Sequence, residues 1–154
     1  MNLELQGKVA LVLGAGGGLG RAIAIALAAE GATLALADIH DESLAQTEQE
    51  VKKRGAGALP LVWDLADLGK VDANVASIEQ RFGAVDVLIN ITGGPPPTPA
   101  AGQDPQLWEK SFAAMILPVI AITDRVLPEM SRHSPASRRQ PRRRLSRRKR
   151  AVRR

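Results

Sequence analysis

The sequence predicts an α/β fold in which a parallel β-sheet is covered by helices on both faces. Short apolar runs alternate regularly with segments of helix-forming residues, and a cluster of glycines follows the first apolar run directly. The chain has 154 residues, of which 45% are hydrophobic, and this suits a single domain with its own core. These observations favour one domain over residues 1–130.

The first repeat of strand and helix follows the N-terminus closely. Residues 8–13, Lys-Val-Ala-Leu-Val-Leu, form an apolar run typical of a buried parallel strand. Residues 19–30 are rich in Ala, Ile and Leu and are predicted to form a helix, which Gly31 ends. A second apolar run over residues 32–37 predicts the next strand, and it stops at Asp38.

The same pattern continues after Asp38. A polar helix is predicted over residues 41–54, and Gly55 closes it. Residues 59–63 predict a third strand, residues 67–82 a third helix and residues 85–89 a fourth strand. Because strands that alternate with helices are joined by right-handed crossovers, all four strands are expected to be parallel.

The region after the fourth strand has a different character. Residues 93–99, Gly-Gly-Pro-Pro-Pro-Thr-Pro, are too rich in proline for regular structure. Residues 105–130 are predicted to be helical, and Pro118 predicts a kink or a break near Leu117. Residues 131–154 contain almost no apolar side chains, so we expect them to form a disordered, arginine-rich tail.

The net charge of +5 averages two unlike segments. Residues 1–130 hold 9 Lys and Arg and all 16 Asp and Glu, a net charge of −7. Residues 131–154 hold 12 Lys and Arg and no acidic residue, a net charge of +12. No aromatic residue is interleaved with these basic ones, so the tail predicts only non-specific, salt-dependent binding to nucleic acid.

The composition excludes several kinds of site. The chain has no cysteine, which excludes disulfides, thiolate metal sites and cysteine nucleophiles. It has no tyrosine to act as an acid or base, and His40 and His133 are too few for a histidine-built zinc site. The N-terminus lacks a basic leader, and no apolar run approaches the ~18 residues of a membrane span. We therefore expect a cytoplasmic protein without membrane contact.

Residues 14–20, Gly-Ala-Gly-Gly-Gly-Leu-Gly, form a glycine turn between the first strand and the first helix. Glycines let the chain turn sharply and bring backbone N–H groups against a phosphate, and the positive end of the helix dipole adds to such an anion site. In this context the glycine turn predicts a dinucleotide-binding site. The alternative is a glycine-rich turn that binds no ligand.

Asp38 ends the second strand, where a carboxylate accepts hydrogen bonds from the ribose hydroxyls of adenosine. A carboxylate there also repels a 2′-phosphate, and the glycine turn has no Lys or Arg before Arg21 to neutralise one. The sequence therefore favours NAD over NADP. The alternative is that Asp38 only caps the next helix, which Asp41 could do alone.

Several motifs resemble those of the short-chain dehydrogenase/reductase family over residues 5–130. The spacing of Gly14, Gly18 and Gly20 is similar to the glycine motif of the family, with Leu13 where a Thr is usual. After the third strand, Asp64-Leu65 resembles the pair that contains the adenine-contacting acid. After the fourth strand, Asn-Ile-Thr-Gly at residues 90–93 resembles a motif that is usually Asn-Asn-Ala-Gly. The stretch from Trp108 to Met130 is similar to the fourth helix of the family.

This resemblance implies a Rossmann-like, three-layer αβα fold with a partial parallel sheet of order 3-2-1-4. It also implies an NAD(P)-dependent oxidoreductase that moves hydride between the cofactor and a carbonyl or alcohol substrate. The backbone from Gly17 to Leu19 is then expected to hold the pyrophosphate. The full set of implied cofactor-binding residues is Gly14, Gly17, Gly18, Leu19, Gly20, Asp38, Asp64, Leu65, Asn90 and Gly93.

The catalytic residues of the family are not found at the expected places. The resemblance implies an Asn on the fourth helix, but Met115 stands at that position. It implies a Ser, a Tyr and a Lys further along, where this chain becomes arginine-rich. We therefore expect no catalytic residue here and a function reduced to cofactor binding, in a chain truncated or frameshifted after about residue 130.

Two other functions stay open. The basic tail, residues 131–154, suits a non-catalytic binding module that docks on nucleic acid or on an acidic partner. Alternatively, the fourth helix, which in the family packs against a partner subunit, would pair with another copy of the chain or with a full-length paralogue. Phe112, Ile116 and Ile120 are apolar residues available for such pairing. With a paralogue, the chain would act as a regulatory subunit.

Overall fold

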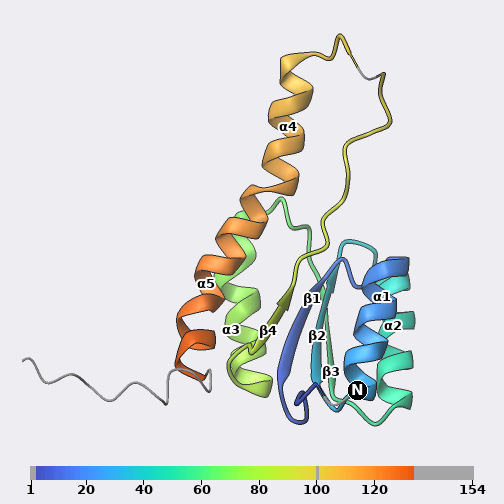
Figure 1. Cartoon of the computed structure of the whole chain (residues 1–154), viewed down its shortest axis with the longest axis vertical. Helices are drawn as coiled ribbons and strands as arrows, with labels where there is room; N and C mark the ends of the chain where they lie inside the picture. Colours follow the sequence, from blue (N-terminus) through green and yellow to red (C-terminus); the bar gives the residue numbers. More distant parts are fainter. Residues whose placement is uncertain (1–2, 100, 134–154) are drawn as a thin grey trace, which may run out of the picture.

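A computed structural model describes residues 3–99 and 101–133 (Figure 1). The strands are β1 (Val9–Leu13), β2 (Thr33–Asp38), β3 (Ala58–Val62) and β4 (Val87–Ile89). The helices are α1 (Gly18–Ala29), α2 (Asp41–Lys53), α3 (Val71–Phe82), α4 (Pro105–Met115) and α5 (Leu117–His133), and a 3₁₀ turn at Leu68–Lys70 precedes α3. Each predicted strand and helix is present, with bounds shifted by a few residues.

The strands are parallel and lie in the order β3-β2-β1-β4, which confirms the predicted topology. In Figure 1, α1 and α2 cover one face of the sheet and α3 and α5 cover the other, so the fold has three layers. α4 projects beyond the upper end of the sheet. The carboxyl ends of β1, β2 and β4 meet at this same end.

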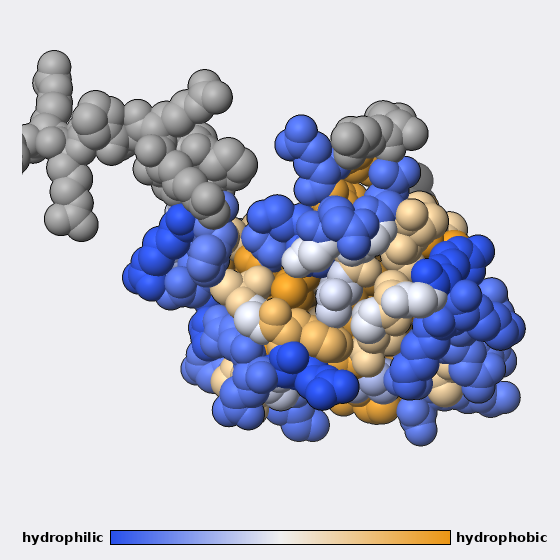
Figure 2. All heavy atoms as spheres, turned by 90° about the horizontal axis from the view of Figure 1, so that it is seen from below, coloured by the Kyte–Doolittle hydropathy of each residue, from blue (hydrophilic) through white to orange (hydrophobic). Residues whose placement is uncertain are grey.

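β1 is completely buried and divides its side chains between two cores. Val9, Leu11 and Leu13 belong to the core beneath α3 and α5, whereas Ala10 and Val12 belong to the core beneath α1 and α2. This alternation follows from the pleat of a strand that is covered on both faces. Seen from the lower end of the sheet, hydrophobic residues gather in the middle and hydrophilic residues flank them on both sides (Figure 2).

β4 is an edge strand among the strands that the structure describes. Its three residues, Val87–Ile89, are only partly buried. Asp86 joins the start of β4 to β1, because its carboxylate accepts hydrogen bonds from the Val9 N–H and from Lys8 Nζ, both at 3.0 Å. This contact aligns the two strands at the end opposite the glycine turn.

The long helix predicted near the C-terminus is divided where Pro118 predicts a break. α4 ends at Met115 and α5 begins at Leu117, so Pro118 occupies the first turn of α5, where a missing N–H costs little. α5 runs to His133, three residues past the predicted boundary at residue 130. An ion pair between Arg132 and Glu129 and the basic residues of its last turn favour this extension.

The remainder of the predicted tail, residues 134–154, lies outside the described residues, together with its predicted disorder and nucleic-acid binding. Within the described part, the helical stretch 105–133 is long and apolar enough, by length and composition only, to cross a membrane. This corrects the expectation that no such run exists. Mostly buried core helices of globular domains meet the same criterion; here 17% of the apolar window is buried, and α5 buries Pro118, Ile122 and Val126.

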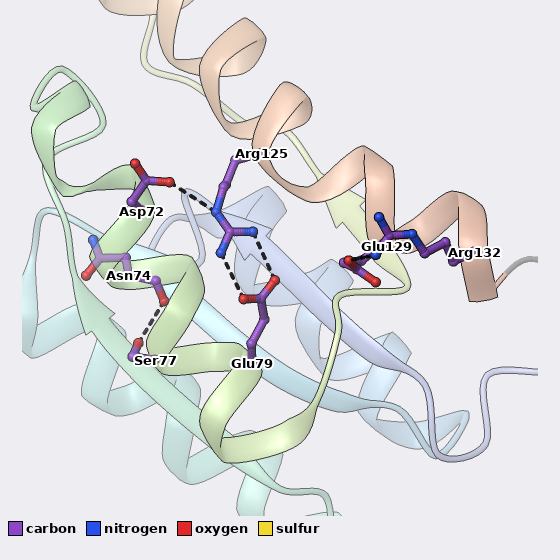
Figure 3. Close-up of polar contacts among 7 residues, drawn as sticks. All are labelled: Asp72, Asn74, Ser77, Glu79, Arg125, Glu129 and Arg132. Carbon is purple, nitrogen blue, oxygen red and sulfur yellow. Dashed lines mark hydrogen bonds and ion pairs between the residues drawn. The ribbon is translucent and has the colours of Figure 1, made fainter.

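Arg125 attaches α5 to α3 (Figure 3). Its Nη1 and Nη2 donate to Oε1 and Oε2 of Glu79 at 3.0 and 2.8 Å, and its Nε donates to Oδ1 of Asp72 at 3.1 Å. The side chains of Arg125 and Glu79 are only 28% and 29% exposed. The hydrogen bonds and the charge of Arg125 lower the pKa of Glu79, against the opposing effect of burial.

We expect Glu79→Gln to lower the free energy of unfolding by about 1 kcal/mol at neutral pH, the size of a well-formed, partly shielded ion pair. Because the pKa of Glu79 is lower in the folded chain, this contribution is complete above the unfolded pKa and is lost as the pH falls through the folded one. Urea unfolding at neutral pH and in acid below about pH 4 measures the difference. Glu109→Gln on α4 is the control, and a Glu79 effect that persists unchanged in acid would contradict the assignment.

Candidate functional site

A cleft of about 620 Å³ opens at the carboxyl ends of the strands. It lies between the glycine turn, the segments that follow β2, β3 and β4, and α4. Six of the ten predicted cofactor-binding residues line it: Gly14, Gly17, Asp38, Asp64, Leu65 and Gly93. The other four, Gly18, Leu19, Gly20 and Asn90, are not among its lining residues.

Two glycines of the turn are in contact with backbone. A Cβ on Gly20 would lie 2.0 Å from the carbonyl oxygen of Gly14, and a Cβ on Gly14 would lie 2.7 Å from the carbonyl oxygen of Ile91. Gly14 also has a φ of 68°, in the left-handed region that favours glycine. Gly14 therefore packs between the start of α1 and the segment that follows β4. Gly20 is buried and contacts the backbone of Gly14.

The first turn of α1 has no capping group. Gly17 is the N-cap residue and offers no side-chain hydrogen bond, and no acidic residue lies in the first turn. Gly17, Gly18 and Leu19 are all exposed next to the cleft. Backbone N–H groups at a free helix N-terminus bind anions, because their donors are unsatisfied and the helix dipole is positive there. This geometry suits a pyrophosphate.

The Asp38 carboxylate lies at the end of β2 and lines the cleft. Its Oδ2 accepts a hydrogen bond from the Gly16 N–H at 2.9 Å, and its Oδ1 accepts one from the His40 N–H at 3.0 Å. Helix α2 has His40 at its N-cap and no side-chain cap. Asp38 therefore does not cap α2, and its carboxylate is held by backbone on the cleft.

Gly16 fits the Asp38 carboxylate closely. A Cβ at residue 16 would lie 2.5 Å from Oγ of Ser43 and 2.9 Å from Cγ of Asp38. Only a glycine leaves the carboxylate room to approach the backbone N–H. The close contact fixes where the two carboxylate oxygens lie.

The remaining predicted residues differ in their surroundings. Asp64 is exposed, and its Oδ1 accepts from the Ala66 N–H at 2.9 Å, which shapes the turn after β3. Leu65 is half-buried against the core beneath α3 and α5. Gly93 is exposed, with no atom within 4 Å of an added Cβ. Asn90 directly follows β4 and is exposed outside the cleft lining.

Two side chains beside the glycine turn were not indicated as site residues by the sequence. Arg21 of α1 and Thr47 of α2 are hydrogen-bonded to each other and to the backbone of the turn. Thr47 is the one buried polar residue within 3–99 and 101–133. Its spacing from Leu44 and Val51 places it on the buried stripe of α2, and this was the available signal.

The region that contains the four strands, the glycine turn and the carboxylate after β2 matches a known protein family. A family model described as short chain dehydrogenase matches residues 8–137. The chain belongs to the short-chain dehydrogenase family. The matched region includes the whole sheet and every residue of the cleft.

One relative of this chain is 2,3-dihydro-2,3-dihydroxybenzoate dehydrogenase of Bacillus subtilis (strain 168). The two are 32% identical over 109 residues, which is 71% of this chain and 42% of the relative. The crystal structure of NAD⁺-bound xylitol dehydrogenase has a TM-score of 0.77 and 30% identity, over 82% of this chain and 49% of that one.

L-sorbose reductase from Gluconobacter frateurii, solved in complex with NADPH and L-sorbose, has a TM-score of 0.78 and 27% identity. The match covers 86% of this chain and 51% of that one. The chain therefore spans about half the length of the curated relatives and solved structures that it matches.

We expect Gly20→Ala to lower the free energy of unfolding by about 2 kcal/mol or more, because the added Cβ overlaps the Gly14 carbonyl. Gly18→Ala is the matched control, since its Cβ would meet nothing within 4 Å and alanine favours a helix. Urea unfolding of the two variants beside the wild type measures the difference. Equal stabilities for the two variants would show that α1 does not touch the glycine turn as described.

Proposed function

We propose that these residues form the NAD-binding part of an oxidoreductase that transfers hydride between the cofactor and a carbonyl or alcohol substrate. One observation carries the proposal: the Asp38 carboxylate is fixed by the backbone at the end of β2, facing the cleft beside the uncapped start of α1. This arrangement offers an acceptor for ribose hydroxyls next to an anion site.

Different residues of the cleft are proposed to bind different parts of the dinucleotide. In the proposed complex Asp38 accepts hydrogen bonds from the adenosine ribose, and the backbone from Gly17 to Leu19 binds the pyrophosphate. Asp64 and Gly93 both line the cleft. In the proposed complex Asp64 contacts the adenine, and Gly93 belongs to the rest of the cofactor site. A bound nicotinamide dinucleotide supplies the ring that carries the hydride.

NAD is proposed in preference to NADP because of the charges around Asp38. Structures similar to this chain contain either cofactor. A 2′-phosphate beside Asp38 would meet a carboxylate, which is unfavourable without a neutralising cation. Arg21, which follows the glycine turn, directs its guanidinium group to acceptors on α2 and on the turn. It is therefore already engaged elsewhere.

Proton transfer is not part of the proposal for these 154 residues. Their sequence contains no tyrosine, the acid/base that the family resemblance implies. Met115 lines the cleft from α4 at the position where the resemblance implies an asparagine, and a thioether cannot replace an amide as a donor. We therefore propose cofactor binding as the activity of these residues, and hydride transfer as that of the longer fold.

Calorimetric titration with NAD tests the proposal. We expect the wild type to bind NAD. Asp38→Asn should weaken NAD binding about tenfold, because a neutral amide loses the charge-assisted bonds to ribose. The ratio of NAD affinity to NADP affinity should also become smaller in this variant. Asp41→Asn, which changes an exposed carboxylate at the start of α2, is the control. No NAD binding by the folded wild type, or equal loss in both variants, would overturn the proposal.

We also propose that a second copy of the chain covers α4. No residue of α4 is buried, and Trp108, Phe112 and Ile116 are 69%, 55% and 41% exposed. These three residues also line an apolar hollow of about 300 Å³ on α4. An apolar patch of this kind is typical of an interface between proteins.

Light scattering after size-exclusion chromatography tests this assembly. We expect a dimer for the wild type and a monomer for Phe112→Glu, because a buried unpaired carboxylate is costly at an interface. Ala113→Glu, which adds the same charge at the next position of α4, is the control. A monomeric wild type at all concentrations would contradict the assembly.

A further inference from the structure

Arg21 joins α1, α2 and the glycine turn through a single guanidinium group. Its Nε donates to Oγ1 of Thr47 at 3.1 Å. Its Nη2 lies 3.3 Å from the Gly16 carbonyl oxygen, 3.2 Å from the Ser43 carbonyl oxygen and 3.1 Å from Oε1 of Gln46. Because Arg21 follows Gly20 directly, these bonds fix the first turn of α1 to both neighbours.

Thr47 continues the contact into the protein interior. Its side chain is completely buried, and its Oγ1 lies 2.9 Å from the Ala15 carbonyl oxygen and 3.1 Å from the Ser43 carbonyl oxygen. The hydroxyl can donate to Ala15 while it accepts from Arg21, so the buried oxygen is fully used. A valine at this position would have nearly the same shape, but the buried Ala15 carbonyl and the part-buried Nε–H of Arg21 would lose this partner.

These contacts act on Asp38 through one peptide unit. The Ala15 carbonyl that Thr47 binds and the Gly16 N–H that Asp38 binds belong to the same peptide group. A peptide group is planar, so fixing the direction of its carbonyl also fixes the direction of its N–H. The Gly16 carbonyl, held by Arg21, restrains the next peptide group as well.

We propose that Arg21 and Thr47 are positioning residues that set the Asp38 carboxylate for recognition of the cofactor ribose. Thr47 holds the peptide group between Ala15 and Gly16, and Arg21 holds the next one, so that the Gly16 N–H keeps Oδ2 of Asp38 in one position. The inference rests on the proposed NAD site and assigns it a determinant of affinity that touches no cofactor atom.

Calorimetric titration of the full chain compares Thr47→Val, which removes the hydroxyl, with Thr47→Ser, which keeps it. We expect Thr47→Val to weaken NAD binding about tenfold and to narrow the preference for NAD over NADP, as Asp38→Asn does, while Thr47→Ser stays close to the wild type. If the two variants bind NAD equally well, or if Thr47→Val changes NAD and NADP binding by the same factor, the proposal is overturned.

Amide hydrogen exchange without cofactor provides a second readout. The Gly16 N–H should exchange at least about tenfold faster in Thr47→Val than in Thr47→Ser, with amides of β1 unchanged. If the wild type binds no NAD, the proposed function fails, and this exchange alone decides whether the contacts position Gly16. Should Thr47→Val not fold, Arg21→Met takes its place, and unchanged Gly16 exchange there would overturn the proposal.

Discussion

The contact between Gly20 and the Gly14 carbonyl is the constraint on which the cleft depends. With a Cβ excluded at residue 20, the first turn of α1 can lie directly on the end of β1. The unsatisfied N–H groups of that turn are thereby brought to the edge of the sheet where β2 and β4 also end. In open parallel sheets the crevice outside the carboxyl ends of the strands is the usual place for a ligand. The close packing of Gly14 and Gly20 therefore places the uncapped N–H groups at the start of α1 beside the cleft.

The two faces of the sheet are held by different interactions, and each has its own effect on the site. On one face, Arg21 and Thr47 connect α1 and α2 to the glycine turn itself. On the other face, α5 is held by Ile122 and Val126 in the core and by Arg125 on α3. Because α4 buries no residue of its own, its position over the cleft depends on how α5 is docked.

The sequence predicted the elements well because each has a local cause. Apolar runs determined the strands, and Pro118 determined the break between α4 and α5. The family resemblance supplied the sheet order, and six of the ten predicted cofactor-binding residues line the cleft. The bond between Arg21 and Thr47 joins residues 26 positions apart on two helices, whose relative rotation no local pattern specifies. The predicted tail boundary followed the loss of apolar residues, whereas charge pairing carries α5 further. Asn90 was named by motif alone, and it lies outside the cleft lining.

The two ends of the cleft are organised to different degrees. At the end next to Asp38, both carboxylate oxygens already have backbone partners, so the proposed ribose contact would need little further ordering. At the other end, residues 93–99 are exposed and have no regular structure, and α4 contributes no buried side chain. A carboxylate held by the backbone suits a cofactor group that is bound in one position, and a loosely held segment suits substrates that differ between enzymes. Relatives named for 2,3-dihydro-2,3-dihydroxybenzoate, xylitol and L-sorbose share 27–32% identity with this chain, so one fold serves enzymes named for different substrates.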